Sequence, residues 1–210
     1  MKRSRRFALL LALLALAVPA TVHASCSTAL LIIDVQELFL TWGNWDTSTG
    51  GDLLAAVANV LALARSAGVP VIYIQDFSIL DVEAVDEGLL GFPAAIGPRE
   101  GDLVFPKGQA DAFTTPEFEA YLEEQGIDRL VLCGLASSGC VSSTLFSAIE
   151  KGFDVTVVAD AHSNGPPDPT TGAPRWPAAE ANRYWISRGV LVVSMGEIDW
   201  DSFACTQEDS

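Results

Sequence analysis

Short runs of apolar residues alternate with longer segments of helical pattern along most of the chain. Six runs are predicted to be buried strands: residues 29–33, 69–74, 103–105, 130–133, 155–159 and 190–194. Four longer segments, each followed by a glycine, are predicted helices: residues 52–67, 114–125, 140–151 and 177–188. Apolar strands between helices are typical of a parallel sheet covered on both faces. The predicted fold class is therefore α/β, with a mostly parallel six-stranded sheet.

Polar residues follow several of these predicted strands directly. The carboxyl ends of parallel strands meet at one edge of a sheet, and ligands bind there in this class of protein. The polar and reactive residues that fall at or just after a strand end, or in the turn that follows one, are Asp34, Asp76, Lys107, Cys140, Asp160 and His162. We therefore expect these residues to gather at one end of the sheet.

Two connecting segments are longer and more polar than plain connections. Residues 41–51 include Trp42 and Trp45, and residues 164–176 include four prolines and Trp176. Such segments either line and cover a site, or lie on the surface with their aromatic side chains packed down. The sequence leaves both interpretations open.

The first 24 residues have the order of a secretory signal peptide. A basic stretch at residues 2–6 precedes an apolar run at residues 7–18, and the small residues Val22 and Ala24 follow. An anchoring helix needs about 20 apolar residues, more than this run supplies. We expect residues 1–24 to be removed and residues 25–210 to form one exported domain, periplasmic or secreted. The choice between general and twin-arginine export stays open.

The exported chain is strongly acidic. The sequence has 12 basic and 27 acidic residues, and residues 1–24 hold four basic and no acidic residues, so residues 25–210 carry a formal charge of −19. Such a surface repels nucleic acids and anionic membranes. We expect a small-molecule substrate, no nucleic acid, and no membrane after signal cleavage. A homo-oligomer is compatible with the sequence.

The four cysteines occupy four different settings. Cys133 lies inside a predicted strand, and Cys140 follows a Ser-Gly pair at the start of a predicted helix. Cys26 and Cys205 lie near the two ends of the exported chain, where an oxidising environment permits disulfides. We predict a disulfide between Cys26 and Cys205, with the other two thiols reduced.

Cys140 is the candidate nucleophile. A thiol at the start of a helix feels the positive end of the helix dipole and the exposed N–H groups, and both favour the thiolate. The same N–H groups can stabilise an oxyanion. The alternative is a buried, inert cysteine.

A cysteine nucleophile needs a base or a cationic neighbour. His162 follows a strand next to the one that leads to Cys140, and Asp34 ends a very apolar strand. A carboxylate held against apolar walls has a raised pKa and is a better base near neutrality. Lys107 would keep Asp34 ionised and favour the thiolate. Spacing alone does not choose between Asp34 and His162.

Three segments together resemble the motifs of the isochorismatase-like cysteine hydrolases. Residues 30–36 (LLIIDVQ) look like the first motif, residues 107–113 (KGQADAF) are similar to the lysine segment, and residues 132–141 (LCGLASSGCV) resemble the nucleophile turn. They occur in the family's order, and the likeness runs from about residue 29 to residue 195.

This resemblance implies a single Rossmann-like three-layer domain and an Asp34–Lys107–Cys140 triad. By analogy, Cys140 attacks the carbonyl carbon of a small amide and forms a thioester, Asp34 moves the protons, and Lys107 orients the pair. The analogy also implies an oxyanion hole from the N–H groups of Ala136 and Cys140, beside a cis peptide bond between Leu135 and Ala136. The family's vinyl-ether hydrolases lack the cysteine, so its presence favours a C–N bond of amide type.

Substrate contacts are expected near the motifs and in the two long segments. The candidates are Gln36, Phe39, Trp42, Asp76, Phe113, His162 and Trp176.

A departure from the family pattern concerns metals. Metal-binding nicotinamidases of the family carry Asp-x-His after the second strand, whereas Asp76-Phe77-Ser78 lacks the histidine. The exported chain has one histidine, His162. We therefore expect no metal and no cofactor. A nicotinamidase-like or other isochorismatase-type hydrolase with an altered site, and a non-catalytic binding protein on the same scaffold, are the alternatives.

Overall fold

Six strands form one parallel sheet within the residues that the computed structural model describes, which are 24–25, 27–78, 86–166, 176–203 and 206–207. Their order across the sheet is β4-β3-β2-β5-β6-β7. The strands are β2 (Thr28–Ile33), β3 (Val71–Asp76), β4 (Leu103–Lys107), β5 (Arg129–Leu135), β6 (Asp154–Ser163) and β7 (Leu191–Val193). Each neighbouring pair is parallel, so the predicted α/β class is confirmed.

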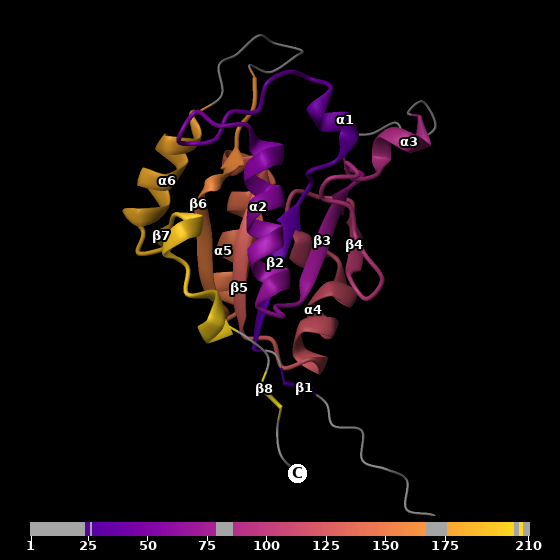
Figure 1. Ribbon diagram of the computed structural model, residues 1–210, viewed down its shortest axis with the longest axis vertical. Helices are drawn as coiled ribbons and strands as arrows, with labels where there is room; N and C mark the ends of the chain where they lie inside the picture. Colours follow the sequence, from indigo (N-terminus) through magenta and orange to yellow (C-terminus); the bar gives the residue numbers. More distant parts are fainter. Residues whose placement is uncertain (1–23, 26, 79–85, 167–175, 204–205, 208–210) are drawn as a thin grey trace, which may run out of the picture.

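Helices cover both faces of this sheet (Figure 1). Helix α2 (Leu53–Ser66) packs on one face, and α4 (Pro116–Glu124), α5 (Ser142–Glu150) and α6 (Ala178–Ile186) pack on the other. These are the four predicted helices, each found within two residues of its expected ends. The sequence does not predict the short helices α1 (Glu37–Leu40) and α3 (Glu87–Leu90), because four residues carry no periodic pattern.

The core is built by alternation along the strands, and β2 shows it best. All six of its residues are buried. Leu30 and Ile32 point into the cluster that α2 covers, whereas Leu31 and Ile33 point into the cluster under α4, α5 and α6. Each such side chain stabilises the fold by about 1.5–3 kcal/mol when fully buried. A strand that is apolar on both sides can therefore lie only in the middle of a three-layer domain.

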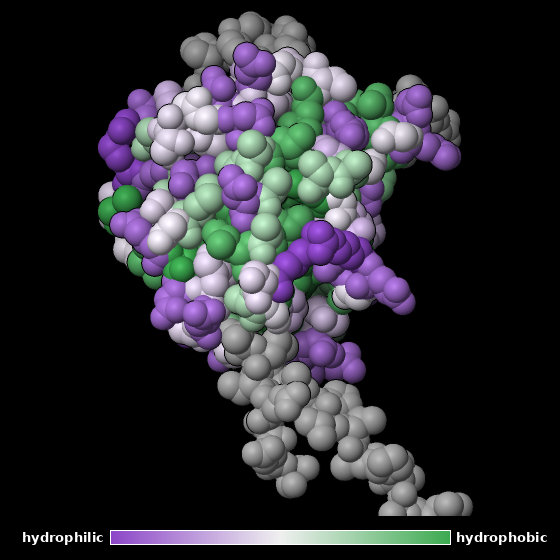
Figure 2. Space-filling view, viewed as in Figure 1, coloured by the Kyte–Doolittle hydropathy of each residue, from purple (hydrophilic) through white to green (hydrophobic). Residues whose placement is uncertain are grey.

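The side of the molecule that carries α2 is seen from outside in Figure 2, where weakly and strongly apolar residues run down the middle of the face. Helix α2 accounts for part of this, because its sequence is largely alanine and leucine and its outer residues include Ala55, Ala62 and Leu63. Its buried side uses Val57 and Leu61. The helix is thus held by packing rather than by a strong contrast between its faces.

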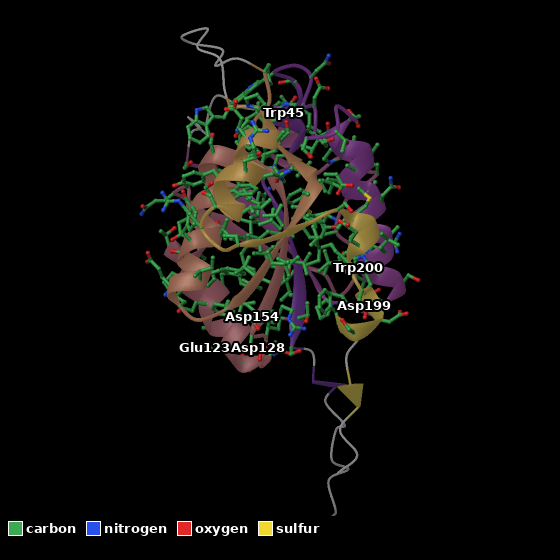
Figure 3. All side chains as sticks on the ribbon, turned by 90° about the vertical axis from the view of Figure 1, so that its left-hand side faces the viewer. Trp45, Glu123, Asp128, Asp154, Asp199 and Trp200 are labelled. Carbon is green, nitrogen blue, oxygen red and sulfur yellow. The ribbon has the colours of Figure 1, made fainter. Side chains whose placement is uncertain are left out.

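The two ends of the sheet differ in character (Figure 3). Asp128 and Asp154 lie at one end, where β5 and β6 begin, and both are exposed. Trp45 lies at the opposite end, towards which the strands run. The predicted site residues belong to this carboxyl end.

The two ends of the described chain meet at the amino end of the sheet. Strands β1 (Ala24–Ser25) and β8 (Thr206–Gln207) pair antiparallel there, with Ser25 opposite Thr206 (Figure 1). Cys26 and Cys205, which follow and precede these two residues, lie outside the described residues, so their disulfide stays a prediction. The predicted signal peptide also lies outside them, except for Ala24. In the part of the chain that is described, no helix combines the length and apolar character needed to cross a membrane.

Candidate active site

Asp34 stands at the end of β2 in a backbone conformation that few residues adopt. Its φ is 56°, the left-handed region, while its N–H still donates to Ile74 O at 3.0 Å and so completes the ladder with β3. Asp tolerates this region better than most residues, but the conformation still costs energy and is found most often where function requires it. The turn leaves the carboxylate buried, with the residue only 2% exposed.

Lys107 ends β4 and is buried as well, at 2% exposure. Its Nζ lies 2.9 Å from Asp34 Oδ2, 3.3 Å from Asp76 Oδ1 and 3.2 Å from Cys140 Sγ. We call these four residues the Lys107 cluster. The structure therefore brings together all three residues of the predicted triad, with Asp76 as a fourth member.

Cys140 lies in an irregular turn between β5 and α5. Residues Ser137–Val141 form a short kinked turn, which we call the nucleophile turn, with non-helical dihedrals at Gly139. The chain enters it through Gly134, whose φ is 118° and where a Cβ would lie 2.1 Å from Ile33 O. Only glycine fits there, because any side chain would meet the backbone of β2.

The predicted cis peptide between Leu135 and Ala136 is wrong. No peptide bond of the described residues is cis. The irregular backbone of this segment lies instead at Gly134, which has a positive φ, and at Gly139, whose dihedrals are not helical.

Burial dominates the electrostatics of the Lys107 cluster. It raises the pKa of Asp34 to about 7, against the opposing influence of Lys107. Burial, with the nearby charge of Asp34, also raises the pKa of Cys140 to about 12, so the thiol is protonated at rest. Burial lowers the pKa of Lys107, but the surrounding anionic groups outweigh it and leave that pKa raised. The thiolate expected from the helix start alone is thus not the resting form.

The carboxylate of Asp34 is free to take a proton. Its Oδ2 lies 2.9 Å from the Lys107 ammonium, and the side chains of Lys107 and Cys140 both act on it as hydrogen-bond donors that lower its pKa. The Cys140 thiol lies beside it, since one ligand atom each from Asp34, Asp76 and Cys140 lie within 4.8 Å of one another. A base in this position can accept the thiol proton directly.

The donor set of Asp34, Asp76 and Cys140 is also one that a metal ion accepts. The ammonium of Lys107, however, lies within 3.3 Å of an atom of each of the three. It already supplies the positive charge at their centre, and a metal ion placed there would be repelled by it. This geometry fits an ammonium better than a metal ion.

Gln36 fixes the backbone of Asp76 through hydrogen bonds. Its Oε1 accepts from Asp76 N at 2.7 Å, and its Nε2 donates to Asp76 O and to Leu90 O. The side chain is fully buried, and both its polar atoms are engaged with protein groups. Gln36 was expected to contact substrate, but the structure gives it this supporting position.

His162 lies in a neutral hydrogen-bonded chain rather than in the Lys107 cluster. Asn182 Nδ2 donates to Ala159 O, which turns its Oδ1 towards His162 Nε2 at 2.6 Å. The Nε2 therefore carries the hydrogen, and Nδ1 accepts from Ser137 Oγ at 2.7 Å. The ring is fully buried, and burial lowers its pKa to about 4. We call Ser137, His162 and Asn182 the His162 network.

Asn164 makes a second contact between the end of β6 and the nucleophile turn. Its Oδ1 accepts from Ser138 N at 2.6 Å and from Ser138 Oγ at 2.9 Å, and its Nδ2 donates to Trp176 O. Sequence reasoning missed Asn164, Asn182 and Ser137. Their partners are 20 or more residues away in the chain, or lie in loops, so no periodic pattern announces them.

The remaining predicted substrate contacts are divided between core and surface. Phe39 is buried and stacks edge-on with the half-buried Trp42, and Phe113 is buried against Phe118. Trp176 is 52% exposed. It lines a cleft of about 600 Å³ together with Ser138, Ser142, Ser143, Phe146, Ala181, Tyr184 and Trp185. The structure brings none of these four to the Lys107 cluster through a hydrogen bond or an ion pair.

The chain matches the family model for the isochorismatase domain over residues 28–174. It is 31% identical over 176 residues to the ureidoacrylate amidohydrolase RutB of Pseudomonas syringae pv. syringae, covering 66% of this chain and 72% of that protein. It is 28% identical over 188 residues to the protein of the same name from Methylorubrum extorquens, covering 71% and 75% of the two chains.

Solved structures share the same architecture. The N-carbamoylsarcosine amidase of Thermoplasma acidophilum superposes with a TM-score of 0.65 at 24% identity, covering 82% of this chain and 99% of the other. A cysteine hydrolase from Pseudomonas syringae pv. phaseolicola gives a TM-score of 0.66 at 21% identity, covering 81% and 90%. At these identities the likeness concerns the fold.

Proposed function

Because the chain belongs to the isochorismatase family of hydrolases, we propose that it cleaves the C–N bond of a small amide with Cys140 as nucleophile. One observation carries the proposal: the buried Lys107 ammonium lies within 3.3 Å of Asp34, Asp76 and the Cys140 sulfur at the carboxyl end of the sheet. Relatives named as ureidoacrylate amidohydrolases support an amide rather than an ether substrate.

The chemistry follows from the two raised pKa values. Asp34, whose pKa is about 7, is the base that removes the proton of Cys140, whose pKa is about 12. The transfer is uphill at rest, so it proceeds together with attack of the sulfur on the carbonyl carbon. Lys107 stays protonated throughout and offsets the negative charge that moves between the carboxylate and the sulfur.

The bond changes then balance over two stages. The C–S bond forms, the carbonyl becomes an oxyanion, and its collapse breaks the C–N bond while Asp34 returns the proton to the leaving nitrogen. The product is an amine and a thioester on Cys140. Asp34 next removes a proton from water, the hydroxide attacks the thioester, and the carboxylic acid leaves as Cys140 regains its proton.

The oxyanion is assigned to the N–H groups of Ala136 and Cys140. The N–H groups of Gly139 and Val141 both donate to Ala136 O, at 2.9 and 3.2 Å, and so are committed to the turn itself. Backbone donors that are fixed before the reaction stabilise a developing oxyanion without reorganisation. The irregular turn around Gly139 supports this assignment, because it separates these N–H groups from a regular helical ladder.

The proposal is tested by ammonia or amine release from a panel of small amides, ureido compounds included. We expect Cys140→Ala to abolish hydrolysis and Cys133→Ala to retain it, because Cys133 is fully buried in β5 away from the cluster. A Cys140→Ala variant that still hydrolysed the best substrate would overturn the cysteine mechanism. An intact protein that binds a panel compound without turnover would instead indicate a binding protein.

Metal independence and export are part of the same proposal. We expect full activity after exhaustive chelation, because Lys107 holds the position that a metal ion would need. Loss of activity that zinc, iron or manganese restores would contradict this expectation. Export is tested by fractionating the producing cells and sequencing the amino terminus, which should begin at Ser25.

A further inference from the structure

We propose that His162 and Asn164 are positioning residues that hold the nucleophile turn, and with it Cys140, against the Lys107 cluster. The inference rests on the proposed role of Cys140 as nucleophile. It concerns two buried side chains at the end of β6 that make no contact with the reacting groups themselves.

Two successive residues of the turn are each held by one of these side chains. Ser137 Oγ donates to His162 Nδ1 at 2.7 Å. Ser138 donates twice to Asn164 Oδ1, through N at 2.6 Å and through Oγ at 2.9 Å. His162 is fully buried and Asn164 is 2% exposed. The turn is therefore attached to β6 by three hydrogen bonds, of which the one from Ser137 is buried and the two from the exposed Ser138 are partly buried.

The attachment continues into the helix layer, because His162 is itself hydrogen-bonded to helix α6. His162 Nε2 donates to Asn182 Oδ1, and Asn182 Nδ2 donates to Ala159 O. The ring also packs edge-on against Trp185, with centroids 4.8 Å apart. A second path reaches the same turn, because Trp185 Nε1 donates to Ser142 Oγ and Ser142 Oγ donates to Ser137 O. Helix α6 thus fixes Ser137 from both its hydroxyl and its carbonyl.

The turn needs this support because its own backbone is irregular. Gly139 has φ −111° and ψ −111°, outside the helical region, so the regular hydrogen-bond ladder does not fix the position of Cys140. The Lys107–Cys140 contact of 3.2 Å and the raised pKa of Cys140 both depend on that position. A distant mutation that misplaces a reacting group by about 1 Å can lower the rate about 100-fold. Buried, fully satisfied networks supply such rigidity.

Two conservative substitutions at His162 separate positioning from packing. An asparagine side chain places its amide near the Nδ1 position of a histidine, so His162→Asn can still accept from Ser137. A glutamine amide reaches the Nε2 position, so His162→Gln can keep Asn182 but loses Ser137. Both variants lose the ring contact with Trp185. They therefore share the loss of the ring, differ by one methylene in volume, and differ in which hydrogen bond they keep.

The readouts are kcat, KM and the pH dependence of Cys140 alkylation by iodoacetamide, followed by peptide mass spectrometry. In His162→Gln we expect kcat to fall about tenfold to 100-fold with KM within about twofold, and the Cys140 pKa to move down towards its ordinary value as the turn loosens. His162→Asn should keep both closer to the parent. Ser137→Ala should resemble His162→Gln, and combining the two should add little, because both remove the same bond.

Asn164→Ala extends the test to the second attachment and should lower kcat in the same way. Ser202→Ala is the control, since Ser202 is an exposed hydroxyl that donates to Asp199 O at the other end of the molecule. Equal effects of His162→Asn and His162→Gln, or an unchanged Cys140 pKa in Ser137→Ala, would show that His162 serves packing alone.

The alkylation readout needs no substrate. It therefore tests the positioning role even if no compound of the amide panel is hydrolysed. Retained hydrolysis in Cys140→Ala would contradict the proposed function without changing the alkylation result.

Discussion

The Lys107 cluster and the His162 network are neighbours at the carboxyl end of the sheet, and both are buried, yet they resolve burial in opposite ways. In the cluster, the Lys107 ammonium pairs with the carboxylates of Asp34 and Asp76, at 2.9 and 3.3 Å. In the network, both nitrogens of His162 are hydrogen-bonded to neutral partners. Burial raises the pKa of Asp34 to about 7 and lowers that of His162 to about 4.

The difference teaches where reactivity can reside in a buried site. Burial disfavours the charged form of either group. Around His162 burial outweighs the hydrogen bond to Asn182 and the charge of Asp160, which both favour the protonated ring, so the ring stays neutral over the physiological range. At Asp34 the nearby Lys107 ammonium partly offsets the effect of burial, so the pKa settles near neutrality and the proton can move. The predictions below test this contrast, beginning with the largest effect.

Asp34→Asn should remove the base and leave the shape of the cluster nearly intact. We expect kcat/KM to fall about 10³- to 10⁴-fold, in the upper range for a general base. Steady-state kinetics on the best panel substrate measures it, with Asp160→Asn as the control. Asp160 lies in β6, where its carboxylate accepts a hydrogen bond from Met195 N. A loss below about tenfold for Asp34→Asn would assign the base elsewhere.

Lys107→Met should show how much the charged cluster depends on its cation. It leaves two buried carboxylates without their counter-ion, so the free energy of unfolding should fall by about 3–5 kcal/mol. Urea unfolding measures it. Lys151→Met is the matched control, because Lys151 pairs with Glu119 at the surface, where both side chains are about one-third exposed, and such a pair contributes about 0–1 kcal/mol. Equal losses in the two variants would contradict the contrast.

Much of the fold was predictable because apolar runs fix the strands. The predicted ends fail where polar residues continue a strand. The run that was expected to stop at residue 159 extends through Asp160 and His162 to Ser163 in β6. Those polar residues belong to the strand because specific partners satisfy them: Met195 N for Asp160, and Ser137 and Asn182 for His162. Hydropathy does not report such partners.

The triad and its surroundings were not equally predictable. Asp34, Lys107 and Cys140 sit at strand ends of a parallel sheet, and topology alone brings them to one edge. The placing of His162 away from Cys140 depends on which way its ring turns, and this is decided by Asn182 and Ala159 O. Contacts between single side chains of different elements leave no periodic mark in the sequence. The raised pKa of Cys140 escaped prediction because burial outweighs the helix start.

Acid stability should depend on His162 in the direction set by its lowered pKa. The folded state binds the proton at about pH 4 and the unfolded state at about 6.5. The contribution of His162 to stability is therefore complete above about pH 6.5 and is lost as the pH falls towards 4, by roughly 3 kcal/mol. His162→Asn should lose this dependence.

Urea unfolding at pH 7.5 and at pH 4.5 gives the measurement, as the difference between parent and variant. Asp34 acts in the opposite sense, because its raised pKa means that the folded state gains stability as the pH falls from about 7. Asp34→Asn lacks this gain, so the variant should lose stability more steeply in acid than the parent does. Parent and His162→Asn curves that stay parallel would show that the ring titrates normally in the folded protein.

Asp76→Asn should produce the smallest effect and the most specific one. Asp76 lies 3.3 Å from Lys107 Nζ, and its negative charge raises the pKa of Asp34. Removing that charge lowers the pKa of Asp34 directly, and it also leaves Lys107 to pair with Asp34 alone, which acts in the same direction. Asp34 must be ionised to accept the thiol proton, so the acid limb of the pH–rate profile should move to lower pH, by less than about one unit.

An asparagine at position 76 can still accept from Ser78 N, which keeps the loop in place. Asp128→Asn is the control, because Asp128 is an exposed carboxylate at the opposite end of the sheet, where solvent and salt screen its charge (Figure 3). An acid limb that stayed in place or moved to higher pH in Asp76→Asn alone would mean that Asp34 does not carry the proton that limits the rate.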